Sequence, residues 1–148
     1  MIAFRLTLQS KSTKMKKSKL IYYLDDDRDD LRFFKDSAES LGHRVLTFLD
    51  AHEMLLMLRN NVGKPDFIFL DIHMPILNGE EILNIIKNSA HWKHIPVVMI
   101  SGAYPKKLVR HFMDVGVNYL MKRPLMNDMK AALDQVLKSD MNRFQEAG

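Results

Sequence analysis

From residue 20 onward, the hydrophobic positions of the chain follow two alternating patterns. Short runs of consecutive apolar residues, such as Leu20 to Leu24, are typical of strands buried on both faces of a sheet. Longer stretches, such as Leu31 to Leu41, carry apolar residues three or four positions apart and are typical of amphipathic helices. The predicted strands are 20–24, 45–48, 67–70, 97–100 and 119–121, and the predicted helices are 31–41, 51–60, 79–86, 108–115 and 129–137.

This alternation of five strands with five helices predicts an α/β fold. Right-handed crossovers between parallel strands place each helix over the sheet, so we expect a doubly wound parallel sheet with helices on both faces. Gly42 and Gly116 are expected to end the helices that precede them.

The composition fits one soluble domain. The chain has 148 residues, of which 47% are hydrophobic and 27% charged, and this length suits a single core. It contains no cysteine, which excludes disulfides and thiolate metal sites. No apolar run approaches the roughly 18 residues that a membrane span requires.

The positive charge belongs to the start of the chain. Residues 1–19 hold six basic residues and no acid, so the rest of the chain carries 16 basic against 18 acidic residues despite the net charge of +4. We expect a disordered leader over 1–19 and no nucleic-acid partner, because such binding requires positive charge on the folded surface. Whether translation starts at Met1 or Met15 stays open.

Polar residues follow the predicted strands. Open parallel sheets bind ligands at the carboxyl ends of their strands, so the residues that follow directly are the candidate functional residues. They are Asp25, Asp26 and Asp27 after the first strand, Asp71 after the third, Ser101 after the fourth, and Lys122 and Arg123 after the fifth.

Clustered carboxylates repel one another unless a cation lies among them. All the candidate ligand atoms are oxygens, which suit a hard ion such as Mg²⁺. This ion coordinates carboxylate and phosphoryl oxygens at the same time. A carboxylate beside such an ion is a competent nucleophile for a phosphoryl group, while a hydroxyl and a cationic side chain stabilise the transferred oxygens. Taken alone, the acidic run 25–30 would be unremarkable as a solvated turn or as a charge cluster at a helix N-terminus.

Three stretches, 22–27, 69–79 and 95–101, carry a family resemblance. Asp71 is followed by Met74-Pro75 and then by Gly79, which is the most specific match. Residues 20–140 resemble the receiver domain of bacterial two-component response regulators of the stand-alone, chemotaxis-regulator-like kind. The resemblance implies a flavodoxin-like sheet of strand order 2-1-3-4-5, followed by a short tail over 141–148.

The resemblance also implies roles for individual residues. Asp71 matches the phosphoryl acceptor, and Ser101 matches the hydroxyl that follows phosphorylation by turning inward. The magnesium ligands would be Asp25, Asp26, Asp71 and the backbone carbonyl of His73.

The chain departs from the family at Lys122-Arg123-Pro124, where the family has Lys-Pro. An ungapped count places Arg123 in the lysine position and Leu120 in the aromatic switch position. A slip of one residue would place Lys122 and Tyr119 there instead, on the other face of the sheet. We take the ungapped count as our expectation.

The function implied is that of a single-domain response regulator, not an enzyme beyond its own autophosphorylation and autodephosphorylation. A histidine kinase or histidine phosphotransfer protein would phosphorylate it in the cytoplasm. Output would pass to an unknown protein target by contact or onward phosphotransfer, with no membrane partner, from a monomer or a weak phosphorylation-dependent dimer. The alternative is a degenerate receiver that acts as a docking scaffold independently of phosphorylation.

Overall fold

The computed structural model describes residues 17–60, 64–72, 79–102, 106–142 and 145–147. Most of the expected leader and residue His73 lie outside this part of the chain. Within it, no helix is long and apolar enough to cross a membrane. The expected division into leader, domain and tail stays a prediction.

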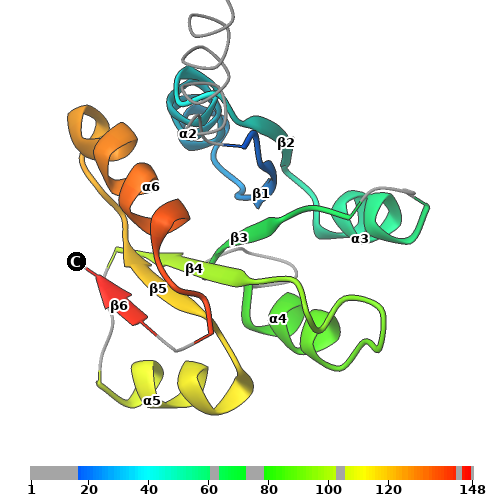
Figure 1. The fold of residues 1–148 in the computed structure, drawn as a ribbon. Helices are drawn as coiled ribbons and strands as arrows, with labels where there is room; N and C mark the ends of the chain where they lie inside the picture. Colours follow the sequence, from blue (N-terminus) through cyan, green and yellow to red (C-terminus); the bar gives the residue numbers. More distant parts are fainter. Residues whose placement is uncertain (1–16, 61–63, 73–78, 103–105, 143–144, 148) are drawn as a thin grey trace, which may run out of the picture.

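A single parallel sheet forms the centre of the molecule (Figure 1). Its strand order is β2-β1-β3-β4-β5-β6, so the predicted order 2-1-3-4-5 is confirmed, with one strand added at the edge. The strands are β1 (Leu20–Leu24), β2 (Arg44–Phe48), β3 (Phe67–Asp71), β4 (Val97–Ser101), β5 (Tyr119–Lys122) and β6 (Gln145–Ala147).

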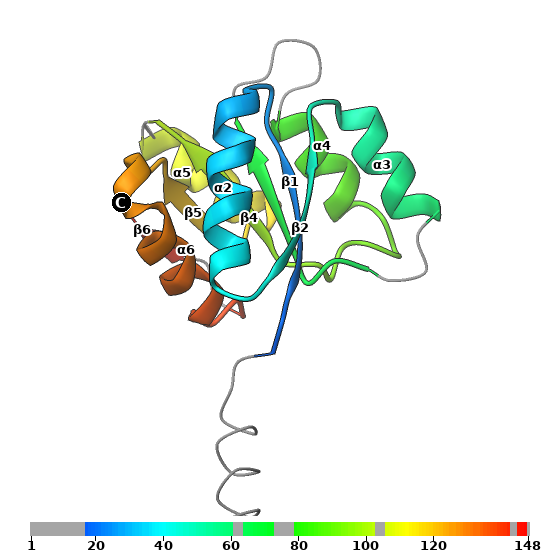
Figure 2. The same ribbon diagram turned by 90° about the horizontal axis from the view of Figure 1, so that it is seen from above.

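Helices cover both faces of the sheet, as Figure 2 shows from above. On one face α2 and α6 pack together, and on the other lie α3, α4 and α5. The helices are α2 (Arg28–Ser40), α3 (Ala51–Asn60), α4 (Gly79–Lys87), α5 (Lys106–Val115) and α6 (Met129–Lys138), with a 3-10 turn η1 (Met126–Asp128) before α6.

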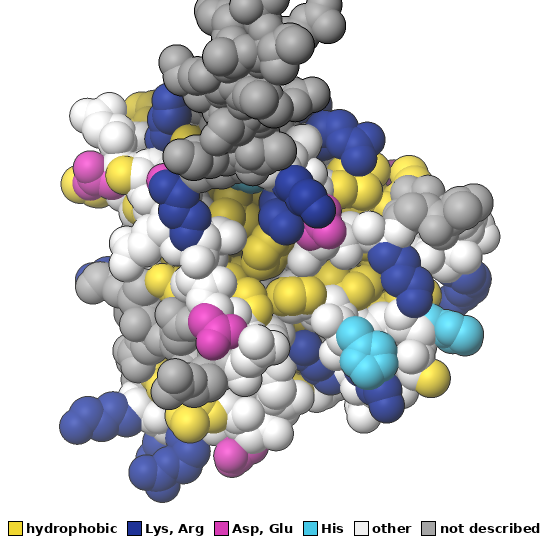
Figure 3. Space-filling model, viewed as in Figure 1, with side chains coloured by type: hydrophobic (Ala, Val, Ile, Leu, Met, Phe, Trp, Pro, Cys, Tyr) yellow, Lys and Arg dark blue, Asp and Glu magenta, His cyan; other side chains and the backbone are white. Residues whose placement is uncertain are grey.

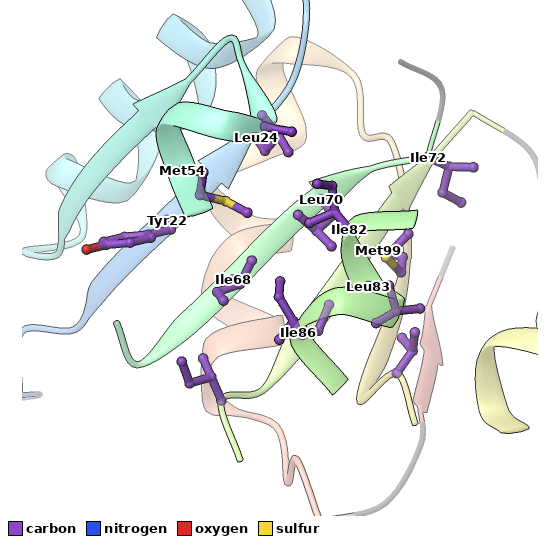
Figure 4. Packing of buried hydrophobic residues seen from close by; sticks show 14 of the residues in the cluster. Tyr22, Leu24, Met54, Ile68, Leu70, Ile72, Ile82, Leu83, Ile86 and Met99 are labelled. Carbon is purple, nitrogen blue, oxygen red and sulfur yellow. The ribbon is translucent and has the colours of Figure 1, made fainter. Parts of the chain in front are cut away.

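Successive residues of the central strands feed two separate cores, because side chains alternate across a sheet. In β1, Tyr22 and Leu24 pack under α3 and α4, whereas Ile21 and Tyr23 pack under α2 and α6. Figure 4 shows the first of these cores, where Ile82 of α4 lies close to the side chains of β3. The continuous apolar runs in the sequence therefore reflect burial on both faces.

The helix boundaries follow from local chemistry. Asp27 caps α2 by accepting hydrogen bonds from the backbone N–H groups of Asp29 and Asp30, at 2.8 and 3.2 Å. Gly42 and Gly116 follow α2 and α5 with φ of +92° and +102°, a conformation that favours glycine. Both predicted helix ends are thus confirmed.

Two details differ from the prediction. Ile85 of α4, expected among the apolar positions of this helix, is 41% exposed, and Leu83 is buried instead. The strand β6 lies in the segment expected to be a short tail and pairs with β5, Tyr119 opposite Gln145. This pairing satisfies backbone groups that would otherwise be exposed at the edge of β5.

Candidate functional site

The carboxyl ends of four strands deliver the predicted site residues to one edge of the sheet. Asp25 follows β1, Asp71 ends β3, Ser101 ends β4 and Arg123 follows β5. Asp25, Asp71 and Ser101 are buried, with exposed fractions of 1%, 3% and 0%. Buried polar side chains are costly unless they interact with one another or with a ligand, so this edge is a candidate site.

Three carboxylates converge here. Asp25, Asp26 and Asp71 each offer an oxygen within 4.8 Å of the oxygens of the other two, and Asp26 is exposed to solvent while its partners are buried. These donors suit a hard divalent cation, which prefers carboxylate oxygens and retains water on its open side. The residues present therefore fit Mg²⁺ or Mn²⁺.

The guanidinium of Arg123 lies among these acids. Its Nη2 donates to Asp71 Oδ1 at 2.9 Å, and its Nη1 donates to Asp25 Oδ2 at 3.3 Å and to Asp30 Oδ2 at 2.5 Å. Burial alone would lower the pKa of Arg123, but the negative charges around it raise that pKa by more. A permanently charged side chain thus offsets part of the repulsion between the carboxylates.

Asp25 is held from three directions. The Tyr23 hydroxyl donates to its Oδ2 at 2.5 Å, and the backbone N–H of Asp27 donates to its Oδ1 at 3.0 Å. Arg123 is the third donor. Burial and the neighbouring Asp25 raise the pKa of Tyr23, so its hydroxyl remains protonated and able to donate.

Two further acids at this edge, Asp26 and Asp30, have raised pKa values. Asp26 is an exposed residue, but partial desolvation of its carboxyl, a hydrogen bond with Asp25 and the charge of Asp25 raise its pKa. Burial also raises the pKa of Asp30, and the charge of Arg123 opposes that rise without cancelling it. Both side chains therefore hold a proton more tightly than they would in water, and at Asp30 the charge of Arg123 offsets only part of this effect.

Arg123 and Lys122 are placed differently. Lys122 is the last residue of β5, opposite Ser101 of β4, and its side chain is exposed. The backbone N–H of Arg123 donates to the carbonyl oxygen of Ser101 at 2.8 Å, and its side chain reaches Asp71.

The positions of Leu120 and Tyr119 in β5 agree with the placement of Arg123. Leu120 is fully buried in the core that also contains Phe112 of α5, whereas Tyr119 belongs to the core on the opposite face, with residues of α2 and α6. This is the arrangement of the ungapped count. The roles of Arg123 and Leu120 in signalling remain a prediction.

Two residues of the site were not among the predicted ones. Asp30 was seen only as part of an acidic run, although its position in the first turn of α2 brings it to Arg123. Tyr23 belongs to the predicted strand and to the matching stretch 22–27 but was assigned no role at the site. Residues two apart on a strand share a face, which places Tyr23 beside Asp25. His73, expected to offer a backbone carbonyl, lies outside the described residues.

Comparison with known proteins gives one consistent family. A family model described as "Response regulator receiver domain" matches residues 21–134. The cyanobacterial phytochrome response regulator RcpA, solved in its phosphorylated form, superposes with a TM-score of 0.73 at 27% identity, over 84% of this chain and 97% of that one. The Mn²⁺-bound response regulator Rcp1 superposes with a TM-score of 0.72 at 22% identity, over 82% and 96%, which shows the shared fold.

Among curated proteins, "Protein RcaC" of Microchaete diplosiphon is 32% identical over 81 residues. These cover 55% of this chain but only 12% of RcaC, and a second curated relative is covered over 20% of its length. The chain thus spans a small part of these longer relatives.

Proposed function

The chain belongs to the response regulator receiver domain family, and from this we propose that Asp71 accepts a phosphoryl group in a two-component phosphorelay. Receiver domains are signalling proteins without a classical catalytic function. The donor would be a histidine kinase or a histidine phosphotransfer protein, the kinds of protein with which receiver domains interact.

The main support for this proposal is the environment of the Asp71 carboxylate. Its carboxylate is buried at the end of β3, bonded to a guanidinium, with two further carboxylates within reach. A carboxylate with a purely structural role needs one hydrogen-bonding partner. Several charged side chains at a ligand-binding edge of a sheet are instead typical of a functional site. RcpA, whose structure contains the phosphorylated protein, supports the same reading.

Asp25, Asp26 and Asp71 would hold a divalent cation, together with the carbonyl of His73. Such a cation, when bound, neutralises charge on the oxygens of the phosphoryl group. The Mn²⁺-bound form of Rcp1 supports this assignment. Asp25 is fixed in orientation by Tyr23 and by the backbone of Asp27, so this ligand would be pre-positioned.

In the transfer step, an oxygen of the Asp71 carboxylate forms a bond to phosphorus. The bond between phosphorus and the donor's leaving atom breaks, and the electron pair of that bond stays with the donor. Arg123 would bind one of the transferred oxygens and the Ser101 hydroxyl another, because both side chains lie at the same edge as Asp71. Slow attack of water on phosphorus would return the free carboxylate and inorganic phosphate.

The output would be a protein–protein event in the cytoplasm, by a monomer or a weak phosphorylation-dependent dimer. Phosphorylation would shift the average arrangement of β5 and the helices beside it and thereby favour one partner. On the face seen in Figure 3, Lys and Arg side chains lie among hydrophobic and other side chains.

The experiment is an intact-mass measurement after incubation with Mg²⁺ and acetyl phosphate. We expect the mass of one phosphoryl group to be added, and this gain to vanish in Asp71→Asn and in EDTA. The matched control is Asp114→Asn, which removes an exposed acid of α5 and should leave the gain intact. No gain in any sample would contradict the proposal and favour the constitutive docking scaffold.

A further inference from the structure

Asp30 and Arg123 form an ion pair that the family resemblance did not predict. Asp30 lies in the first turn of α2, 93 positions before Arg123, and accepts from its Nη1 at 2.5 Å. The two side chains are 33% and 29% exposed, so the pair is partly shielded from water. A charge-assisted hydrogen bond in such a place is stronger than an exposed pair on the surface.

The guanidinium of Arg123 competes with any cation that binds at this edge. It donates to Asp25 Oδ2 and Asp71 Oδ1, and these two residues are also among the three proposed cation ligands. A divalent ion bound there would repel the guanidinium and share its acceptors. For the ion to bind well, Arg123 has to weaken its bonds to these two residues and still have an acceptor for its charge.

We propose that Asp30 is a positioning residue for the divalent-cation site, which it serves by giving Arg123 an acceptor outside the ligand set. The inference rests on the proposed function of Asp25, Asp26 and Asp71 as cation ligands. With Asp30 present, the guanidinium keeps one bond and a neutralising charge while Asp25 and Asp71 turn to the ion. Without Asp30, the guanidinium of Arg123 keeps its bonds to those two carboxylates, and its positive charge repels the ion.

Asp29 provides a matched control for this idea. It lies one residue earlier in the same turn of α2 and carries the same charge, but it pairs with Arg32 at 3.5 Å with both side chains well exposed. Removing Asp29 therefore measures the general loss of negative charge near the site. Neutralising Asp30 measures that loss together with the loss of the charged acceptor of Arg123, because an asparagine amide oxygen binds a guanidinium more weakly than a carboxylate does.

The test is the affinity for Mn²⁺, measured by the electron paramagnetic resonance signal of the free ion. We expect Asp30→Asn to weaken binding roughly tenfold, the change that corresponds to about 1.4 kcal/mol. Asp29→Asn should weaken binding by no more than about twofold, as expected of a screened surface charge. Asp30→Glu, which keeps the charge, should restore most of the affinity.

A second background separates the action through Arg123 from direct attraction of the ion. In the Arg123→Ala background, the additional change Asp30→Asn should weaken Mn²⁺ binding no more than Asp29→Asn does, because the side chain that Asp30 positions is gone. Far-ultraviolet circular dichroism of each variant checks that it is folded.

Equal losses in Asp30→Asn and Asp29→Asn would overturn the inference and leave the cation site standing. A tenfold loss that persists in the Arg123→Ala background would also overturn it, because Asp30 would then act on the ion directly. No Mn²⁺ binding by the unaltered protein would overturn the cation site of the proposed function and the inference with it.

Discussion

Gly79 approaches Asp71 so closely that no side chain fits between them. A Cβ atom on Gly79 would lie 2.2 Å from the carbonyl oxygen of Asp71 and 3.0 Å from its carbonyl carbon. Both atoms belong to the backbone of β3, which cannot move aside as the end of a flexible side chain would. The first residue of α4 is thus packed directly on the backbone of the proposed phosphoryl acceptor.

The contact predicts that Gly79→Ala displaces α4 from β3. We expect a loss of stability of about 1–3 kcal/mol, as is usual for overpacking a close contact, measured by urea denaturation. Gly102→Ala is the control, because a Cβ at Gly102 meets no atom within 4 Å. Equal urea midpoints for the two variants would contradict this prediction, because the contact between Gly79 and Asp71 would then tolerate a side chain.

The hydrogen bond from Tyr23 to Asp25 predicts a measurable loss in Tyr23→Phe. A hydrogen bond to a charged acceptor contributes about 1.5–3 kcal/mol, and Asp25 is 1% exposed, so water replaces the hydroxyl poorly. Urea denaturation in EDTA should show a loss in that range. Tyr119→Phe is the control, since the Tyr119 hydroxyl forms no hydrogen bond with any described residue. An equal loss in both variants would contradict this account.

The different placements of Lys122 and Arg123 predict different effects on phosphorylation. Arg123→Ala should slow the gain of a phosphoryl group from acetyl phosphate on the order of 100-fold, the usual effect of removing one charge-stabilising donor. Lys122→Ala should change the rate by less than about twofold, because that side chain is exposed at the end of β5 and Arg123 is the residue that donates to Asp71. Arg123→Lys, which keeps a charge, should recover part of the rate. A larger effect at Lys122 would reverse the assignment.

The pKa of Asp26 predicts a response to pH and to Mg²⁺. Partial desolvation and Asp25 raise it above its ordinary value of 3.8, so the folded protein holds this proton more tightly than the unfolded chain. The resulting stabilisation is present at low pH and is lost as pH rises through the folded pKa. Carboxyl carbon NMR titration should give a pKa above 3.8 in EDTA and a lower one in Mg²⁺, because a cation favours the ionised form. A value at or below 3.8 in EDTA would contradict the prediction.

Much of the fold could be predicted because each central strand is buried on both faces. Such strands appear in the sequence as unbroken apolar runs, as in Phe67 to Leu70, and alternate with helical periods. The strand β6 could not be predicted, since Gln145-Glu146-Ala147 carries no strand pattern and its pairing with the edge of β5 involves backbone groups, which every residue type offers. The prediction for Ile85 was wrong because the buried face of α4 runs through Gly79, Ile82, Leu83 and Ile86, and Ile85 lies at the margin of that face.

The same contrast holds for the site. Asp25, Asp71 and Ser101 could be predicted because topology alone brings the carboxyl ends of parallel strands together. The pairing of Arg123 with Asp30 depends on the reach of a long side chain between segments 93 positions apart, which no local pattern encodes. The register of β5 was open for a related reason, since Lys122 and Arg123 carry the same charge.

The central claim is that Asp71 is the phosphoryl acceptor, and locating the modification along the chain tests it most directly. Borohydride reduces an aspartyl phosphate to homoserine, so reduction after incubation with Mg²⁺ and acetyl phosphate marks the modified residue for peptide mass spectrometry. We expect homoserine at position 71 and at no other position. Homoserine at Asp25 or Asp26, or an unmodified Asp71 in protein that has gained a phosphoryl group, would contradict the account.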